Sequence, residues 1–204
     1  MNVQGLGKAI KKISRKIETN KDYLVKLDQQ NGDGDLGISM SDGFKAVDIL
    51  LELSEEEDLG KILMKSGNAF NEAAPSSLGT ILSFGFMGMA KSLKGKSEAG
   101  PAEIMDAFQA GIIKIMEKAG SKPGERTILD SLYPAVKACE KTIAEGGTMD
   151  IALKNAAKAA ADGAETTKQM RPVHGRAAYY GEKSLGHMDG GAAVGQLIFD
   201  ALSE

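Results

Sequence analysis

The sequence contains no tryptophan, one cysteine and two histidines, and aromatic residues occupy only 5% of its 204 positions. A single cysteine excludes an internal disulfide and is typical of a reducing cytoplasm, which is where we expect the protein to act. Long apolar runs are also missing. No stretch approaches the roughly 20 residues that a membrane-spanning helix needs, and the N-terminus lacks the apolar core of a signal peptide.

A strong excess of charge of one sign is absent as well. The 25 basic residues nearly balance the 28 acidic ones, which leaves a net charge of −3. Nucleic acids and anionic membranes attract basic surfaces, so we expect neither as a partner. The length and the 42% share of hydrophobic residues do suit a globular domain with a substantial core.

The lone cysteine, Cys139, is either a nucleophile or part of the core. It continues an apolar series with helical spacing, which favours a buried helix face. The other members of the series are Leu129, Leu132, Val136 and Ile143. No segment alternates with period two, and strand-forming residues are scarce, so we do not expect a β-sheet.

Apolar residues recur with helical spacing along the chain, beginning with a first helix over residues 3–17. Short connections between such segments favour antiparallel neighbours, so we predict a single all-α domain of about seven to nine helices over residues 1–204. The later helices are expected near 22–30, 38–53, 56–72 and 77–93, from 101 onward, near 125–144 and 148–167, and from 192 to the C-terminus.

Residues with capping chemistry mark where several of these helices begin. Ser54 followed by Glu57 matches a capping box and predicts a helix start near residue 56. Ser76 or Ser77 is expected to cap the helix after it. Further start signals are Pro101, which suits a first helical position, and Thr148.

The segment NGDGDLG, residues 31–37, concentrates two aspartates and three glycines, and Asp28 lies shortly before it. The carboxylates of Asp28, Asp33 and Asp35 would repel one another unless a cation lay between them. They are hard oxygen donors of the kind that Mg²⁺ and Ca²⁺ prefer. The alternative is a solvated turn, because aspartate and glycine are also common turn formers.

Two metal sites are compatible with this loop. Counted from Asn31, it nearly matches a calcium-binding EF-hand, but the sixth position is Leu36 rather than glycine and the twelfth is Asp42 rather than glutamate. Magnesium with a phosphate ligand fits better, since Mg²⁺ keeps positions for phosphate oxygens. The loop also leads into a helix whose first amides, from Leu36 to Ser39, would face an anion.

Three further segments break the helical pattern and are candidates for function. Residues 73–80 offer serines at a helix start, and residues 119–130 contain Lys122 and Arg126, either of which could face phosphate. Residues 171–191 form a long connection of the kind that often closes over a binding site. There Arg176 is a candidate phosphate ligand, and Asp189 is expected to cap the last helix or to bind a ribose hydroxyl. The two histidines of this connection, His174 and His187, match no metal motif and favour structural roles.

Taken together, these segments resemble the DhaL family, the nucleotide-binding subunits of bacterial dihydroxyacetone kinases. The resemblance covers essentially the whole chain. It is carried by Asp28 with GDGDLG (32–37), SLGT (77–80), KPGERTILD (122–130) and GRAAYYGEKSLGHMDGGA (175–192).

The resemblance implies a barrel of eight antiparallel helices with ADP or ATP at one end. It implies that Asp28, Asp33 and Asp35 hold two Mg²⁺ ions and that no side chain of this subunit acts as a nucleophile or base. It assigns nucleotide contacts to Leu36, Gly37, Ile38, Ser39, Ser76, Ser77, Thr80, Gly120, Ile128, Arg176, Asp189, Gly190 and Gly191.

The resemblance also implies partners. A phosphocarrier subunit of the phosphotransferase system (DhaM-like) would rephosphorylate bound ADP, and a separate subunit (DhaK-like) would hold the sugar. Two departures from the family pattern touch the phosphate-facing loops: Leu36 stands where the family usually has histidine, and Ala74-Pro75 stands where it usually has Ser-Gly.

Other functions fit part of the same pattern. One is an ATP-dependent kinase module for another small sugar. Another is a non-catalytic module that reports nucleotide occupancy to a transcriptional regulator. A calcium sensor is the remaining alternative.

Overall fold

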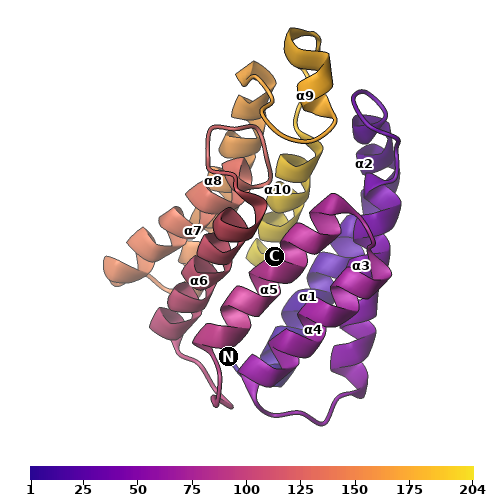
Figure 1. Ribbon diagram of the computed structural model, residues 1–204. Helices are drawn as coiled ribbons and strands as arrows, with labels where there is room; N and C mark the ends of the chain where they lie inside the picture. Colours follow the sequence, from indigo (N-terminus) through magenta and orange to yellow (C-terminus); the bar gives the residue numbers. More distant parts are fainter. The chain divides into compact units, whose positions relative to one another are not determined.

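The computed structural model describes residues 1–204, and helices account for all of its regular secondary structure except one isolated bridge between Asn2 and Glu98 (Figure 1). The all-α prediction is confirmed. No helix is long and apolar enough to span a lipid bilayer. The helices are α1 (Val3–Thr19), α2 (Lys21–Asp28), α3 (Leu36–Leu53), α4 (Leu59–Ala73), α5 (Ser77–Ser92), α6 (Pro101–Ala119), α7 (Leu129–Ala144), α8 (Met149–Thr166), η1 (Thr167–Gln169), α9 (Ala177–Tyr180), η2 (Gly181–Ser184) and α10 (Gly190–Ser203).

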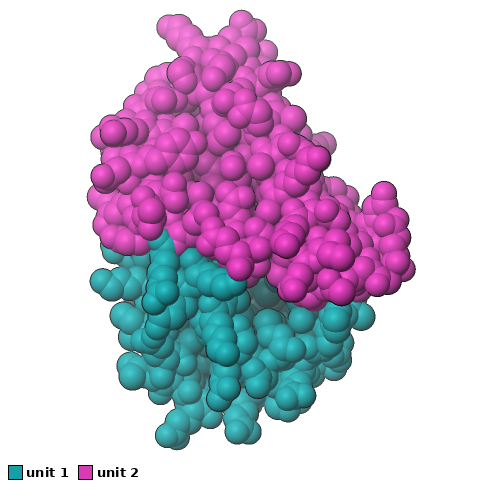
Figure 2. Space-filling model, turned by 180° about the vertical axis from the view of Figure 1, so that it is seen from behind, with its two compact units in different colours: residues 1–15, 39–120 teal, residues 16–38, 121–204 magenta.

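The chain forms two compact units, drawn in different colours in Figure 2. Unit 1 comprises residues 1–15 and 39–120, and unit 2 comprises residues 16–38 and 121–204. In unit 1, α5 packs against both α4 and α6. In unit 2, α7 and α8 are neighbours, and α10 packs against both of them and against α2.

The core of unit 1 contains three phenylalanines. The Phe44 and Phe70 rings meet edge to face with their centroids 4.9 Å apart, and the centroid of Phe86 lies 5.9 Å from that of Phe70. Such geometry matches the quadrupoles of the rings. A close helix contact lies beside this cluster, because a Cβ added at Gly88 would lie 2.5 Å from the carbonyl oxygen of Ala110. Glycine therefore lets α5 approach α6.

The core of unit 2 is built around the alanine-rich face of α8. Four alanines one turn apart are fully buried: Ala152, Ala156, Ala160 and Ala164. Their small side chains permit the close contacts of α8 with α7 and α10. Cys139 of α7 is also fully buried, and burial raises the pKa of its thiol to about 11. The cysteine is thus a core residue with no thiolate for nucleophilic chemistry, as its spacing indicated.

Three predicted helix starts are confirmed. Ser76 is the N-cap of α5 and accepts a hydrogen bond from the Gly79 amide, at 3.1 Å. Pro101 is the first residue of α6, and Thr148 caps α8. These short-range signals depend only on neighbouring residues, which is why the sequence displays them.

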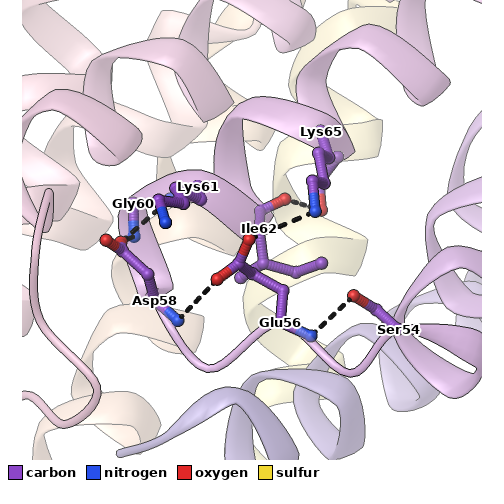
Figure 3. A network of polar contacts seen from close by, with 8 residues as sticks. Ser54, Glu56, Asp58, Gly60, Lys61, Ile62 and Lys65 are labelled. Carbon is purple, nitrogen blue, oxygen red and sulfur yellow. Dashed lines mark hydrogen bonds and ion pairs between the residues drawn. The ribbon is translucent and has the colours of Figure 1, made fainter.

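The predicted capping box at Ser54 and Glu57 is wrong. Helix α4 begins at Leu59, and its N-cap is Asp58, whose carboxylate accepts hydrogen bonds from the amides of Gly60 and Lys61 at 2.8 and 3.0 Å. Figure 3 shows these contacts with the loop before them. Ser54 instead accepts a hydrogen bond from the Glu56 amide, which holds that residue in the loop.

Other parts of the chain also differ from the prediction. Helix α3 begins at residue 36 rather than near 38. Helix α7 begins at residue 129 rather than near 125, because Gly124 and Arg126 adopt left-handed backbone angles with φ of 94° and 60°. The connection 171–191, expected to lack helical structure, contains α9 and η2.

The N-cap of α4 provides a test of this boundary. Hydrogen bonds from the amides of Lys61, Gly60 and Gly95 hold the pKa of Asp58 below its ordinary value of 3.8. The stability that the carboxylate contributes is then fully present above pH 3.8 and is lost as the pH falls through the lower pKa of the folded state. Asp58→Ala should lower the urea midpoint of unfolding at neutral pH, and the difference from wild type should shrink in acid.

The exposed Glu57 is the control, because the discarded capping box would use it. Glu57→Ala should leave the midpoint nearly unchanged. A loss as large as that of Asp58→Ala would contradict the assigned cap.

Candidate functional site

The acidic loop lies between α2 and α3, in unit 2. Asp28 ends α2, and Asp33 and Asp35 follow in the loop. The carboxylates of these three residues each offer an oxygen, and these oxygens all lie within 4.8 Å of one another. The sequence prediction that this loop gathers three carboxylates is therefore correct in its geometry.

The loop is folded tightly around the Asp28 side chain. The Gly34 amide donates a hydrogen bond to the Asp28 carboxylate at 2.8 Å, and Gly34 has a φ of 80°, which favours glycine. A Cβ added at Gly32 would lie 2.2 Å from the nearest Asp28 oxygen. The glycines of the motif thus make room for a carboxylate that the backbone encloses.

The electrostatics of the loop are unbalanced. Burial, together with the negative charges of Asp33 and Asp28, raises the pKa of Asp35. A hydrogen bond from Arg176 lowers the pKa of Asp33, and the same contact raises the pKa of Arg176. One guanidinium therefore faces three carboxylates, and negative charge remains for a further cation to neutralise.

This donor set fits a magnesium or calcium ion. All three ligands are carboxylate oxygens, without nitrogen or sulfur, and they are close enough to share hard cations. The EF-hand alternative is excluded, because α3 begins at Leu36, so that positions six and seven, which form the turn of an EF-hand loop, already lie in a helix.

A pocket with a volume of about 320 Å³ adjoins the acidic loop. Its walls come from two segments that are far apart in the sequence, and they consist of Asn31, Gly32, Arg176, Tyr179 and Tyr180. The ion pair between Arg176 and Asp33 joins these segments, and Figure 1 shows α9 and the end of α2 at the same end of unit 2. Two loops that the sequence indicated separately thus form one site.

Sequence reasoning gave the two tyrosines no role, and it considered Asn31 only as the first position of an EF-hand loop. Tyr179 is 93% exposed and Tyr180 is 48% exposed, although both are large aromatic residues. The signal that could have found the tyrosines is their tandem position in a segment that is otherwise rich in glycine.

The N-terminus of α10 contains Asp189, which was expected to cap this helix or to bind a ribose. It is the N-cap, and its carboxylate accepts a hydrogen bond from the Ala192 amide at 2.8 Å. Burial raises the pKa of Asp189 to about 6. Its own amide donates to the hydroxyl of Thr167 at 3.0 Å, which ties the helix start to the end of α8.

Several of the other predicted contacts gather at this helix start. A Cβ added at Gly190 would lie 2.6 Å from the Leu36 side chain, and one added at Gly191 would lie 3.2 Å from the Ile128 amide nitrogen. Leu36 and Ile128 are both buried. Leu36 is thus packed against α10 rather than extended toward solvent.

The α3 start follows the acidic loop directly. A Cβ added at Gly37 would lie 2.2 Å from the carbonyl oxygen of Lys21, so glycine lets α3 begin close to α2. The adjacent Ile38 is 49% exposed. The first amides of α3 are therefore placed at the loop that carries the aspartates.

The remaining predicted contacts belong to unit 1. The hydroxyls of Ser39 and Ser76 lie 2.7 Å apart, and Thr80 donates a hydrogen bond to Asn71 at 3.1 Å. Ser77 is the first residue of α5, and Gly120 ends α6 with a φ of 61°. The structure thus gives Ser76 and Gly120 capping roles, and nucleotide contact by these residues stays a prediction.

The proposal that Arg126 faces phosphate is wrong. Arg126 is 3% exposed, and its guanidinium donates to the backbone carbonyl oxygens of Ser184 and His187, each at 2.8 Å. Lys122 lies on the surface, 4.0 Å from Glu125. A structural role for His174 is supported, since its Nε2 lies 2.7 Å from the Glu125 carboxylate.

The sequence pattern of the DAK2 domain family matches residues 30–204, which include the acidic loop from Asn31 onward, the pocket and the start of α10. The chain belongs to the DAK2 domain family.

Curated relatives of this DAK2 domain include ADP-binding DhaL subunits of PEP-dependent dihydroxyacetone kinases. The subunit of Escherichia coli (strain K12) is 29% identical over 187 residues, which cover 92% of this chain and 89% of that protein. A subunit of Listeria innocua is 30% identical and covers 92% of this chain and 88% of its own. These relatives match the DAK2 domain over nearly their whole length.

A solved structure shares the fold. The crystal structure of the dihydroxyacetone kinase from C. freundii in complex with AMP-PNP and Mg²⁺ superposes with a TM-score of 0.77 at 24% identity. The match covers 97% of this chain and 33% of that kinase, so the DAK2 domain spans about a third of its length.

The ion pair of Arg176 with Asp33 predicts that this arginine weakens metal binding when no nucleotide is present in this DAK2 domain. A metal ion that takes the Asp33 carboxylate must displace the guanidinium. Without nucleotide, Arg176→Ala should therefore tighten Mn²⁺ binding by about two- to fivefold, the range expected for an exposed ion pair. Electron paramagnetic resonance titration of free Mn²⁺ measures the effect.

Arg171→Ala removes an exposed arginine five residues earlier and serves as the control. Weaker Mn²⁺ binding by Arg176→Ala in the absence of nucleotide would contradict the placement of this arginine.

Proposed function

We propose that this chain is the nucleotide-binding subunit of a dihydroxyacetone-type kinase, a phosphotransferase that passes a phosphoryl group to a small hydroxy-ketone. The observation that carries the proposal is the trio of carboxylates beside Arg176, in a chain that matches DhaL subunits over nearly their whole length. Phosphoryl transfer depends mainly on positioning and on neutralising phosphate charge, and a carboxylate cluster with an arginine suits both tasks.

In this proposal Asp28, Asp33 and Asp35 hold two magnesium ions. Ions bound there would neutralise phosphate oxygens and orient the γ-phosphoryl group for in-line transfer. Arg176 exchanges its contact with Asp33 for a phosphate oxygen, because a guanidinium pairs well with either group. The first amides of α3 face the phosphates, where the positive end of the helix dipole favours an anion.

The other nucleotide contacts follow from the resemblance. In this proposal residues 1–204 form one nucleotide-binding domain. Near the phosphates they include Leu36, Gly37, Ile38, Ser39, Ser76, Ser77 and Thr80. Toward the base and ribose they include Gly120, Ile128, Asp189, Gly190 and Gly191. The chain contributes no nucleophile or general base, so the acceptor hydroxyl is activated on the partner that holds the sugar.

Two sources of the phosphoryl group are compatible with this site. One is a DhaM-like phosphocarrier that would rephosphorylate retained ADP, which agrees with the E. coli and Listeria relatives being named ADP-binding subunits of PEP-dependent kinases. A second candidate is direct use of free ATP, favoured by the shared fold with a longer kinase crystallised with an ATP analogue. In both cases we expect a separate DhaK-like subunit to hold the hydroxy-ketone in the cytoplasm.

Asp33→Asn tests the metal site. The carboxylate is half exposed, so its loss should leave the helical circular dichroism spectrum intact. Magnesium-dependent ADP binding, measured by isothermal titration calorimetry, should weaken by more than about tenfold, because a charged metal ligand becomes neutral. Asp42→Asn is the matched control, since Asp42 is an exposed acid of α3 outside the cluster.

Equal ADP affinity in wild type and Asp33→Asn would exclude the assigned site. A loss of magnesium-dependent ADP binding in Asp42→Asn as large as that in Asp33→Asn would also contradict the assignment, because Asp42 lies outside the cluster.

Native mass spectrometry separates the two phosphoryl sources. Protein purified with magnesium should retain ADP and two metal ions if the nucleotide is a resident cofactor. Added ATP should then displace the ADP slowly compared with turnover driven by a phosphocarrier. Rapid exchange with free ATP would favour the second candidate instead.

A further inference from the structure

Arg126 has an unusual environment for an arginine. It is buried, it is the only residue other than glycine with a positive φ, and its Nε finds no hydrogen-bond partner. A buried arginine at a strained backbone position destabilises the folded state unless hydrogen bonds to its guanidinium compensate. The partners of its other donor atoms show which part of the chain it binds.

All of these donors point to one segment. The Nη1 atom contacts the hydroxyl of Ser184 and lies 3.5 Å from the carbonyl oxygen of Met170. The Nη2 atom donates to the carbonyl oxygens of Ser184 and His187, at 2.8 Å each. The guanidinium thus bridges the beginning and the end of the segment 170–188.

Between these ends lie the residues that form one wall of the pocket, namely Arg176, Tyr179 and Tyr180. A compact surface loop needs its ends fixed close together. Two other hydrogen bonds close the base of the loop: the Gly186 amide to the carbonyl oxygen of Lys168 at 2.8 Å, and the Asp189 amide to Thr167. The Arg126 side chain adds donors to both ends of the segment.

We propose that Arg126 is a positioning residue, whose guanidinium clamps the segment 170–188 and thereby holds Arg176 against the carboxylates of the acidic loop. This role deepens the proposed function, because it acts on the same site. Arg126 touches neither the metal ligands nor the pocket. Its effect passes through the loop that it closes.

Arginine suits this task better than lysine. Its planar fork presents several donors in fixed directions and can bridge carbonyl groups that lie apart, whereas a lysine ammonium is a single point at the end of a flexible stem. The sequence KPGERTILD puts the arginine in a tight turn, whose left-handed residues aim its side chain inward. In the sequence this role is indicated only by an arginine in a glycine-containing turn, and the same pattern is equally typical of a phosphate ligand.

Hydrogen–deuterium exchange of the full chain without nucleotide tests the clamp. In Arg126→Met, exchange of residues 171–183 should rise about tenfold or more relative to exchange of α8, since hydrogen bonds to a charged group are lost. Arg126→Lys should restore part of the protection. Arg171→Met removes an exposed arginine at the base of the same loop and should leave the ratio unchanged.

The ratio to α8 keeps the test decisive even if Arg126→Met is less stable overall. An equal rise in the loop and in α8, or no rise in the loop, would overturn the clamp.

A double-mutant cycle on magnesium-dependent ADP binding tests whether Arg126 acts through Arg176. Arg126→Met and Arg176→Ala should each weaken binding. The double variant should bind like Arg176→Ala alone, because without the Arg176 guanidinium there is no side chain left for Arg126 to position. Additive losses would overturn the positioning role. Wild-type protein that binds no ADP with magnesium would refute the proposed function instead, and the exchange result would still show whether the clamp exists.

Discussion

Mutual repulsion among the carboxylates of Asp28, Asp33 and Asp35 is the constraint on which the rest of the site depends. Their oxygens lie within 4.8 Å of one another, and burial together with the negative charges of Asp33 and Asp28 raises the pKa of Asp35. Carboxylates this close together are stabilised in their charged form by positive charge nearby. Arg176 supplies part of that charge, and a divalent ion would supply the rest.

The surrounding structure follows from this constraint. Glycines at positions 32 and 34 let the backbone close around Asp28, and α3 begins immediately after the last aspartate. The loop that brings Arg176 is held by Arg126, which is itself buried and donates to the backbone carbonyl oxygens of Ser184 and His187. The two arginines thus have different roles: Arg176 faces the carboxylates, and Arg126 fixes the segment that carries Arg176.

Local signals in the sequence predicted much of this protein. Helical spacing predicted the all-α class, and the caps at Ser76 and Thr148 depend only on adjacent residues. The metal candidates were equally readable, because hard oxygen donors cluster within eight positions of the chain. Family resemblance added the nucleotide contacts, which remain predictions.

Contacts between residues far apart in the sequence could not be predicted from the sequence. Nothing local shows that Arg126 binds carbonyl groups about sixty positions away, so its charge suggested a phosphate ligand. The α4 cap was misread because several acidic and hydroxyl residues precede the helix, and only the folded loop shows that Asp58 reaches the free amides. The pocket tyrosines were missed for the same reason, since their exposure depends on how the loop closes.

The tyrosines also give the protein an optical property. The chain has no tryptophan and four tyrosines, and two of these, Tyr179 and Tyr180, line the pocket beside Arg176. The strongest ultraviolet emission of the folded chain therefore comes from its phenol rings, and two of the four line the pocket. A ligand bound against these two rings would change the native fluorescence, with no stronger indole signal to mask the change.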